Sequence, residues 1–415
     1  MAVALADRTE GGASPGALEG VRVVDMSTVV MGPFATQILG DLGADVIKVE
    51  PPGGEPTRHV FPQRHPGMSA LSMNVNRNKR SLAVDLKNPK GVEILFELLD
   101  TADLLVTNLR SGALDRLGLG YERLAERFPR LIYCHAQGFR SDSALANRAA
   151  YDEIVQAASG LADLMRRVTG KPYYVPTILG DKLCSLTIVY SALAALHRRD
   201  RTGRGQLVEV PMTDTLLAFN LVEHLEGYTF EPPLGPMGFG RSVTPTHRAV
   251  RTKDGWACIL PYSLKNIHDF LAAAGRADLA GDPRFTTPAG LAEHRAELYE
   301  LIERIAPEKT TADWEALCVE RGIPFSPVLD ITKVTEDPYV TEGNLIREAE
   351  HPTEGTYRIV QPPVRLSANP ATVRRHPPRP GEHSAEVLAE LGHPLREIQE
   401  LAAAGVVAAE LAEGR

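Results

Sequence analysis

The chain has 415 residues, of which 43% are hydrophobic and 24% are charged, a composition that excludes a disordered or fibrous protein. Because single hydrophobic cores rarely grow beyond about 250–300 residues, we expect two or three domains. The formal net charge is −8 and the chain contains no basic block, so we expect no nucleic-acid partner.

The cysteines and the N-terminus indicate the compartment. Cys134, Cys184, Cys258 and Cys318 show no CxxC spacing and no pairing pattern, which predicts reduced thiols in a cytoplasmic protein. Residues 1–17 lack the basic start and the long apolar stretch of a signal peptide, so we expect a disordered tail there. No run of 18 apolar residues predicts a membrane span, and no membrane partner is expected.

From residue 18 to about residue 212, short runs rich in Val, Ile and Leu alternate with segments of helical periodicity. This alternation is typical of β-α-β units around a mainly parallel sheet. Pro33 opens one predicted helix and Gly203 ends another. The predicted strands are 21–25, 46–50, 81–86, 104–109 and 131–136, and the predicted helices are 33–42, 88–99 and the segment before Gly203.

The second half of the chain has a different pattern. A cluster of Gly and Pro residues near 235–245 predicts a loop or linker. One strand and three helices after it predict a smaller α+β domain, and the C-terminal region carries a strand and two amphipathic helices whose apolar faces must be buried. The predicted elements are a strand at 255–261, helices at 263–274, 289–306 and 311–321, a strand at 357–360, and helices at 384–391 and 395–408.

Several common catalytic motifs are absent. The chain has no GxGxxG after the first predicted strand, no Walker motif, no HExxH and no GxSxG. Its twelve histidines are scattered without metal-ligand spacing. We therefore expect an enzyme that uses neither a metal nor a nicotinamide.

The clearest chemical signal lies around Asp181, which falls at or beside the start of the long helix that ends at Gly203. In one interpretation, its carboxylate caps the helix by accepting an orphan N–H. In the other, the positive end of the helix dipole keeps the carboxylate ionised, and Gly180 allows a ligand to approach closely. Such a carboxylate could attack an acyl carbonyl.

A series of motifs in order along the chain resembles the class III CoA-transferase family, which is also called CaiB/BaiF and includes formyl-CoA transferases. The weaker matches are ERGIPFSPVLD at 320–330 and GEHSAEVLAELG at 381–392. The stronger motifs are LEGVRVVDMS at 18–27, MGPFATQILGDLGADVIKVE at 31–50, NKRSLAVDLKNPKG at 78–91, NLRSGALDRLGLGYE at 108–122, LGDKLCS at 179–185 and RTGRGQLVEVPMTD at 201–214.

The resemblance implies a CoA transferase in which the carboxylate of Asp181, in the pair formed with Gly180, attacks an acyl-CoA thioester. An aspartyl anhydride forms first, then an aspartyl thioester of CoA, and CoA finally passes to a carboxylic acid acceptor. Backbone donors must stabilise each oxyanion. CoA is thus a substrate, and no permanently bound cofactor is implied.

The resemblance also implies which residues contact the CoA nucleotide. Lys87 suits a phosphate as a point charge, and Arg116 suits one as a guanidinium fork. Without the resemblance, these positions would be interpreted as ordinary loop and surface residues. The implied set is Val30, Met31, Asp85, Leu86, Lys87, Asn108, Leu109, Arg110 and Arg116.

Tyr151 and Asp152 align with an aromatic–acidic pair beside the active site of the family, although Asp152 could instead cap the helix that follows it. Racemases of the same fold, which invert α-methylacyl-CoA thioesters, carry His-Asp at this place. Tyrosine, with a reference pKa of about 10, is a poor base near neutral pH, which favours a transferase. A racemase or isomerase and a non-catalytic acyl-CoA-binding homologue remain as alternatives.

Gly238 and Gly240 resemble a short form of the glycine-rich loop that covers the intermediates in formyl-CoA transferases. Arg241, His247 and Arg248 follow this loop. An arginine there could hold a distal carboxylate by a bidentate pair, or these charges could simply be exposed on a linker. The first interpretation predicts succinyl-CoA or another short dicarboxylyl-CoA as donor.

Two positions depart from the family pattern. Pro51 stands where formyl-CoA transferases place a basic residue, and Ala149 where they place a CoA-contacting lysine. Some nucleotide contacts must therefore differ.

We predict an α/β protein with a Rossmann-like large domain and mainly parallel sheet at 18–235 and a small α+β domain at 236–345. A C-terminal segment at 346–415 should return to the large domain. The resemblance implies an interlocked homodimer. Because the chain has no basic excess, phosphate recognition must depend on a few local groups such as Lys87 and Arg116.

Overall fold

The computed structural model describes residues 16–279 and 281–409. The predicted tail therefore lies outside the described residues, except for its last two positions. Of these, Gly16 belongs to a turn in which its carbonyl accepts the N–H of Glu19 at 3.0 Å.

The described chain forms two compact units. The first is made of 16–159, 176–219 and 343–409, and the second of 160–175 and 220–342. The sequence analysis placed 160–175 and 220–235 in the large domain, whereas their contacts group them with the second unit. Part of the reason is that Arg167 donates to the carbonyl of Met237 at 3.1 Å.

A seven-stranded sheet forms the centre of the first unit. Its strand order is β12-β3-β2-β1-β4-β5-β6. All neighbouring strands are parallel except β12, which runs antiparallel to β3. The order 3-2-1-4-5-6 is that of the doubly wound dinucleotide-binding fold, so the predicted Rossmann-like α/β class is confirmed. The strands are β1 (Arg22–Asp25), β2 (Asp45–Glu50), β3 (Lys79–Val84), β4 (Leu104–Thr107), β5 (Ile132–Gln137), β6 (Leu207–Pro211) and β12 (Val407–Ala408).

Helices bury both faces of this sheet, as the near-continuous apolar runs of its strands require. Pro89 occupies the first turn of α3, and the Asn88 side chain caps that helix through the N–H of Lys90 at 3.0 Å. The helices of this unit are α1 (Met31–Asp41), α2 (Ala70–Val75), α3 (Pro89–Asp100), α4 (Ser111–Arg116), α5 (Tyr121–Arg127), α6 (Asp152–Ala158), α8 (Leu179–Thr202), the first part of α9 (Met212–His224), α16 (Ser384–Glu390), α17 (Leu395–Ala403) and the 3-10 turn η1 (Pro56–His59).

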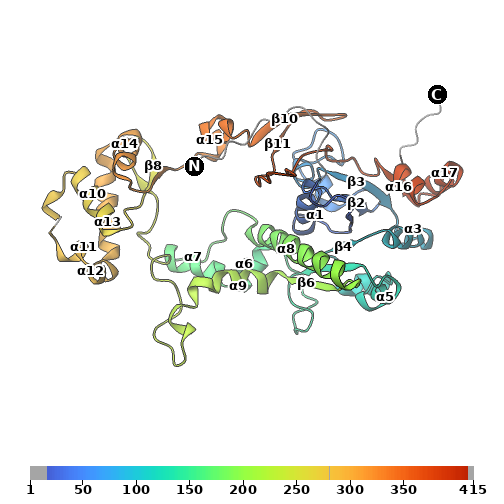
Figure 1. Cartoon of the computed structure of the whole chain (residues 1–415), viewed down its shortest axis with the longest axis horizontal. Helices are drawn as coiled ribbons and strands as arrows, with labels where there is room; N and C mark the ends of the chain where they lie inside the picture. The colour runs from blue at the N-terminus through green and yellow to red at the C-terminus, as the bar shows by residue number, and fades with distance from the viewer. Residues whose placement is uncertain (1–15, 280, 410–415) are drawn as a thin grey trace. The chain divides into compact units, whose positions relative to one another are not determined.

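The C-terminal segment completes the first unit. An antiparallel hairpin, β10 (Ile346–His351) and β11 (Gly355–Val360), precedes it. Helix α16 then lies beside β3 (Figure 1), α17 packs on α16 and β12, and Leu388 and Ile398 join the core that contains Leu82. The predicted helix at 395–408 was too long, because Gly405 takes a left-handed φ of 69° and the chain then pairs with β3 as β12.

The long helix α8 packs along α1, α6, β5 and β6. It ends at Gly203, which has a φ of 73°, as predicted. By length and composition alone α8 could cross a membrane, but Cys184, Ile188, Ala192 and Ala195 are fully buried along it, as in a core helix of a globular unit.

The second unit is α+β, as predicted. A three-stranded antiparallel sheet of β7 (Val250–Arg251), β8 (Trp256–Ile259) and β9 (Phe325–Pro327) packs with a group of helices (Figure 1), where Phe270 stacks on Trp314. The predicted helix at 289–306 is two helices that meet at His294. The helices are α7 (Leu161–Thr169), the end of α9, α10 (Leu264–Ala273), α11 (Pro283–Thr286), α12 (Pro288–Glu293), α13 (Arg295–Ile305), α14 (Thr311–Arg321) and α15 (Pro338–Glu342), with 3-10 turns η2 (Glu226–Thr229), η3 (Ala277–Leu279), η4 (Ala306–Glu308) and η5 (Ile331–Glu336).

Candidate active site

The strand order of the first unit reverses direction between β1 and β4, and the loops that follow these two strands touch. Asn108, directly after β4, accepts the N–H of Thr28 at 2.8 Å and donates to the Thr28 carbonyl at 2.8 Å. In open α/β sheets, ligands bind in the crevice at such a reversal, outside the carboxyl ends of the strands. The structure thus brings Val30 and Met31 together with 108–110 at the edge of the sheet where a ligand is expected.

The start of α1 is arranged to receive a negative charge. Val30 is its N-cap residue, no side chain caps it within the described part of the chain, and its first turn holds no acidic residue. Uncapped N–H groups at a helix start favour an anionic ligand. The side chains of Val30 and Met31 are buried, so any contact that these residues make with a ligand must involve the backbone.

The predicted cationic contacts lie in exposed loops and helix ends. Lys87 follows β3 in a turn in which the Asp85 carboxylate accepts the Lys87 N–H at 2.9 Å, and Leu86 packs on the core. Arg110 precedes α4 and Arg116 ends it, and both are exposed. Leu109 is half-buried against the core.

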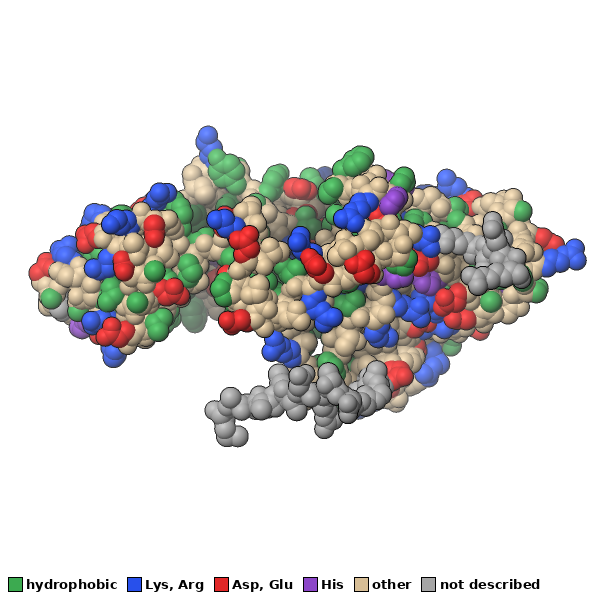
Figure 2. All heavy atoms as spheres, turned by 90° about the horizontal axis from the view of Figure 1, so that it is seen from above, with side chains coloured by type: hydrophobic (Ala, Val, Ile, Leu, Met, Phe, Trp, Pro, Cys, Tyr) green, Lys and Arg blue, Asp and Glu red, His purple; other side chains and the backbone are tan. Residues whose placement is uncertain are grey.

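The two positions that depart from the family pattern, Pro51 and Ala149, are both exposed. Figure 2 shows acidic and basic side chains interspersed on the face that it draws, with no large basic patch. Phosphate recognition by a few local groups stays a prediction.

Asp181 lies in the first turn of α8, three positions after the N-cap residue Ile178, and does not cap that helix. Asp152 of α6 does so instead: its Oδ1 accepts the N–H of Asp181 at 3.1 Å. Gln156 holds the other oxygen of Asp152 with its Nε2 at 2.5 Å. The interpretation in which Asp181 caps α8 is therefore wrong, because Asp152 of the neighbouring helix α6 supplies the capping carboxylate.

Gly180 makes this arrangement possible. A Cβ atom at this position would lie 3.0 Å from Oδ1 of Asp152 and 3.5 Å from Val155. The missing side chain therefore leaves room for the capping carboxylate of Asp152, rather than only for a ligand as the sequence analysis expected.

The Asp181 carboxyl group has an unusual electrostatic environment. Burial, followed by the neighbouring carboxylates of Asp152 and Glu153, raises its pKa to about 7. This direction is opposite to the interpretation in which the helix dipole keeps the carboxylate ionised, because burial and the two neighbouring carboxylates both disfavour the charged form. Within residues 16–279 and 281–409, no hydrogen bond or ion pair engages this carboxyl group. It is a basic carboxylate with free oxygens, as a nucleophile requires.

Ser185, which the sequence analysis did not single out, links Asp181 to the start of α1. Its Oγ lies 2.7 Å from the carbonyl of Met31 and 2.8 Å from the carbonyl of Asp181. The first turn of α8 is therefore tied to the crevice at β1. Tyr151, by contrast, is the N-cap residue of α6 and is 66% exposed.

The remaining predicted residues lie in the second unit. Gly238 has a φ of 109°, and a Cβ there would lie 2.6 Å from the Arg167 guanidinium. The loop is held by His224, whose carbonyl accepts the N–H of Gly238 at 2.9 Å and whose Nδ1 accepts that of Phe239 at 3.0 Å. Gly240 is exposed in open space.

The three charged residues after this loop differ in availability. Arg248 pairs with Glu303 at 2.7 Å, whereas the guanidinium of Arg241 lies over the Tyr262 ring at 5.0 Å. His247 stacks on Tyr299 with ring centroids 4.8 Å apart, and burial, together with the charge of Arg241, lowers its pKa. His247 is therefore neutral at pH 7 and beside a cation. A cavity of about 230 Å³ is lined by both His247 and Arg248.

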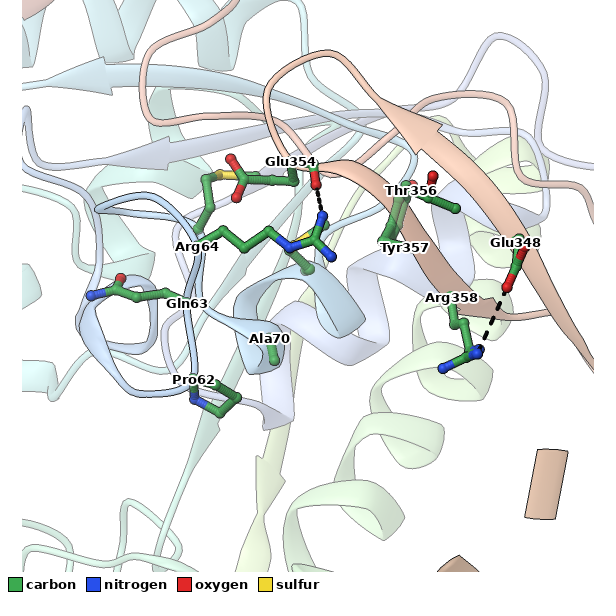
Figure 3. Close-up of a pocket in the computed structure, with 11 residues that line it drawn as sticks. Pro62, Gln63, Arg64, Ala70, Glu348, Glu354, Thr356, Tyr357 and Arg358 are labelled. Carbon is green, nitrogen blue, oxygen red and sulfur yellow. Dashed lines mark hydrogen bonds and ion pairs between the residues drawn. The ribbon is translucent and has the colours of Figure 1, made fainter. Parts of the chain in front are cut away.

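A larger cavity, of about 510 Å³, lies in the first unit between residues 62–73 and the β10–β11 hairpin. Figure 3 shows Gln63, Arg64 and Ala70 on one side of it and Arg358 on the other. None of the residues predicted to contact substrate lines this cavity. Volume alone therefore does not identify the active site.

Comparison with known proteins shows the family to which the chain belongs. The sequence profile described as "CoA-transferase family III" matches residues 18–384. The chain therefore belongs to this family, as its motifs predicted, and it is a class III CoA-transferase.

Similar proteins span nearly the whole chain. Human "Succinyl-CoA:glutarate CoA-transferase" is 33% identical over 395 residues, covering 94% of this chain and 90% of the relative. "Formyl-CoA:oxalate CoA-transferase" of Escherichia coli O157:H7 is 33% identical over 400 residues, covering 91% and 96%. The crystal structure of Rv3272 from Mycobacterium tuberculosis is 31% identical with a TM-score of 0.78, covering 90% of this chain and 99% of that one. A CaiB/BaiF family protein from Brucella suis is 28% identical with a TM-score of 0.78, covering 91% and 100%.

Proposed function

We propose that the protein moves CoA from an acyl-CoA thioester to a carboxylic acid, with Asp181 as the nucleophile. The environment of Asp181 is the observation that carries this proposal. Its carboxyl group has no partner among the described residues, its pKa is raised to about 7, and Ser185 ties its turn to the start of α1. A thioester is attacked by the ionised form, and a basic carboxylate is the stronger nucleophile.

The reaction proceeds through two kinds of covalent intermediate. The Asp181 carboxylate attacks the thioester carbonyl of the donor, so that an acyl-aspartyl anhydride forms and the CoA thiolate leaves. The thiolate then attacks the aspartyl carbonyl, which releases the donor acid and leaves an aspartyl thioester. The acceptor carboxylate attacks this thioester, CoA thiolate leaves again, and its attack on the acceptor carbonyl gives the new acyl-CoA and frees Asp181.

The anionic nucleotide of CoA is proposed to bind at the crevice between β1 and β4. The uncapped start of α1, at Val30 and Met31, supplies N–H groups for it. Lys87, Arg110 and Arg116 are exposed cations after β3 and β4 and are proposed to contact the phosphates. CoA is thereby a substrate and not a resident cofactor.

The donor is proposed to be succinyl-CoA or another short dicarboxylyl-CoA. The human relative is named for succinyl-CoA and glutarate, and the Escherichia coli relative for formyl-CoA and oxalate. Of the two arginines considered, Arg248 is engaged by Glu303, so Arg241 is the proposed partner of the distal carboxylate. Gly238 and Gly240 are proposed to let the loop approach the substrate.

We propose that the protein is a homodimer. Large apolar side chains remain exposed on α6, α8 and the first part of α9, and exposure of several such groups is typical of an interaction surface. A location in the cytoplasm stays a prediction. The exposed side chains are Tyr151, Ile154, Leu186, Tyr190, Leu217 and Phe219.

Incubation with succinyl-CoA and a panel of mono- and dicarboxylic acids tests the reaction. We expect a new acyl-CoA with at least one acceptor, and release of an equal amount of succinate. No exchange with any acid or any short acyl-CoA would contradict the proposal. Exchange of the α-proton of a 2-methylacyl-CoA in deuterated water, without CoA transfer, would indicate a racemase instead.

A further inference from the structure

The loop between β1 and α1 is held by buried side chains from other parts of the sheet. At Ser27, the N–H donates to the Asp25 carboxylate at 2.9 Å, and the carbonyl accepts from Nζ of Lys48 at 2.9 Å. Asp25 and Lys48 are both 0% exposed. The backbone of this residue is thus fixed by two charged groups that water cannot reach.

The next two residues are fixed in the same way. Both polar backbone groups of Thr28 bond to the Asn108 amide, each at 2.8 Å. The N–H of Val29 donates to the Glu55 carboxylate at 3.3 Å, and Glu55 is only 1% exposed. Side chains that follow β2 and β4 therefore hydrogen-bond to the backbone of the short loop that follows β1.

Val29 has a conformation that it would not adopt unaided. Its φ is 68°, in the left-handed region that β-branched residues strongly disfavour. Such a conformation persists only where the surroundings enforce it, and it is found most often at functional sites. Glu55 and Asn108 both bond to the peptide group that joins Thr28 to Val29, so they fix the backbone on the N-terminal side of the strained residue.

The buried charged side chains around this loop are paired with opposite charges, which keeps them in place. Lys79 bonds to Asp25 at 2.8 Å, and Arg58 bonds to Glu50 at 2.6 Å. Buried charges are stable only when they are paired and hydrogen-bonded. The buried set contains three cations and three anions, namely Lys48, Arg58, Lys79, Asp25, Glu50 and Glu55.

The loop leads directly into the start of α1. A Cβ at Gly32 would lie 2.1 Å from Cβ of Ser27, so the loop and the first turn of the helix are in direct contact. We propose that Glu55 and Asn108 are positioning residues for CoA: they hold Val29 in its left-handed conformation and so orient the N–H groups at the start of α1 toward the CoA nucleotide. This inference rests on the proposed function, because it takes CoA as the ligand of that helix start.

Binding of CoA alone, measured by calorimetry, tests the inference. Glu55→Gln should weaken CoA binding about tenfold, because the grip on Val29 loosens and the site is no longer preorganised. Adding Val29→Gly to Glu55→Gln should restore the affinity to within about threefold of wild type, since glycine adopts a positive φ without support. If Glu55→Gln weakened CoA binding by disturbing another part of the unit, a change at Val29 would not restore the affinity.

Asn344→Gly is the matched control, because Asn344 also has a positive φ, of 50°, and is exposed. In the Glu55→Gln background it should restore nothing. Unchanged CoA affinity in folded Glu55→Gln, or an equal loss with and without Val29→Gly, would overturn the inference. If Glu55→Gln does not fold, Glu55→Asp, which keeps the carboxylate but shortens its reach to the Val29 N–H, replaces it with the same expected loss and the same rescue.

The measurement separates this inference from the proposed reaction, because it detects binding and not turnover. Wild-type protein that binds CoA but transfers none would contradict the reaction and leave the inference to be decided by the variants. Wild-type protein that binds no CoA would contradict both.

Discussion

The loop after β1 in the first unit and the glycine-bearing loop at 236–240 in the second are held in opposite ways. The first is gripped by buried charged side chains such as Lys48 and Glu55, which leave its backbone one conformation. The second is held by His224 and by Arg167, which is exposed, and the arginine beyond it rests on an aromatic ring. From this difference we propose a division of roles: the loop held by buried charges serves the CoA that every cycle uses, and the loop held by exposed contacts serves the acid that varies.

The largest effect is expected at Asp181, which lies in the same unit as the loop after β1. Asp181→Ala should lower kcat by about 10³-fold or more, because no other group can form the covalent intermediate, while CoA binding stays within about threefold. Steady-state kinetics and calorimetry check the two halves. Asp214→Ala is the matched control, since Asp214 is also acidic and lies in the first turn of a helix, α9; it should keep its turnover. Retained turnover in Asp181→Ala would contradict the assignment.

The first turn of α8, in the same unit as the loop after β1, should respond to a single methyl group. Gly180→Ala would place a Cβ 3.0 Å from the Asp152 carboxylate, which must shift to accommodate it. We expect kcat to fall about 30-fold with a smaller change in KM, because small displacements at a reacting group are costly. Gly53→Ala, at an exposed glycine with open space around it, is the control and should behave as wild type.

The pH dependence sharpens the electrostatic part of the comparison. Because the pKa of Asp181 is raised to about 7, the reactive carboxylate is lost as pH falls through that value. The donor kcat/KM should therefore decrease about tenfold per pH unit below pH 7. Asp152→Asn removes the negative neighbour and should move the midpoint to lower pH. A midpoint that stays in place, or moves upward, would show that Asp152 does not raise the pKa of Asp181.

Arg241, directly after the loop at 236–240, should give the smallest and most selective effect when it is substituted. Arg241→Gln should raise KM for succinyl-CoA about tenfold and leave the KM for acetyl-CoA nearly unchanged, because only the first carries a distal carboxylate. Arg251→Gln removes another arginine that lies over an aromatic ring, that of Trp256, and should change neither. Equal effects on both donors would remove Arg241 from substrate selection.

Most of the sheet could be predicted, because each of five strands contains fully buried apolar residues between segments of helical periodicity. Examples are Val23, Ile47, Leu82, Leu105 and Ile132. The prediction missed β6 and β12. Strand Leu207–Pro211 has only three apolar residues before its proline and is interrupted by Glu209, and Val407–Ala408 is too short to leave a pattern. Strand β12 forms only because Gly405 ends α17 and returns the chain to β3.

The residues around the reacting groups were harder to predict. Asp181 could be proposed from its motif, but the cap supplied by Asp152 and the link through Ser185 join segments that are distant in the sequence. Lys48 did leave a local signal, as a charge inside an apolar strand, yet nothing in the sequence says that it grips Ser27. The roles of these residues depend on hydrogen bonds to residues that are distant in the sequence.

The central claim is that Asp181 becomes covalently linked during transfer, and mass spectrometry of the protein mixed with acyl-CoA tests it most directly. After quenching with hydroxylamine, we predict a hydroxamate on the peptide that contains Asp181, and none in Asp181→Ala. Transfer that proceeds without any adduct, or with an adduct on another residue, would contradict the account.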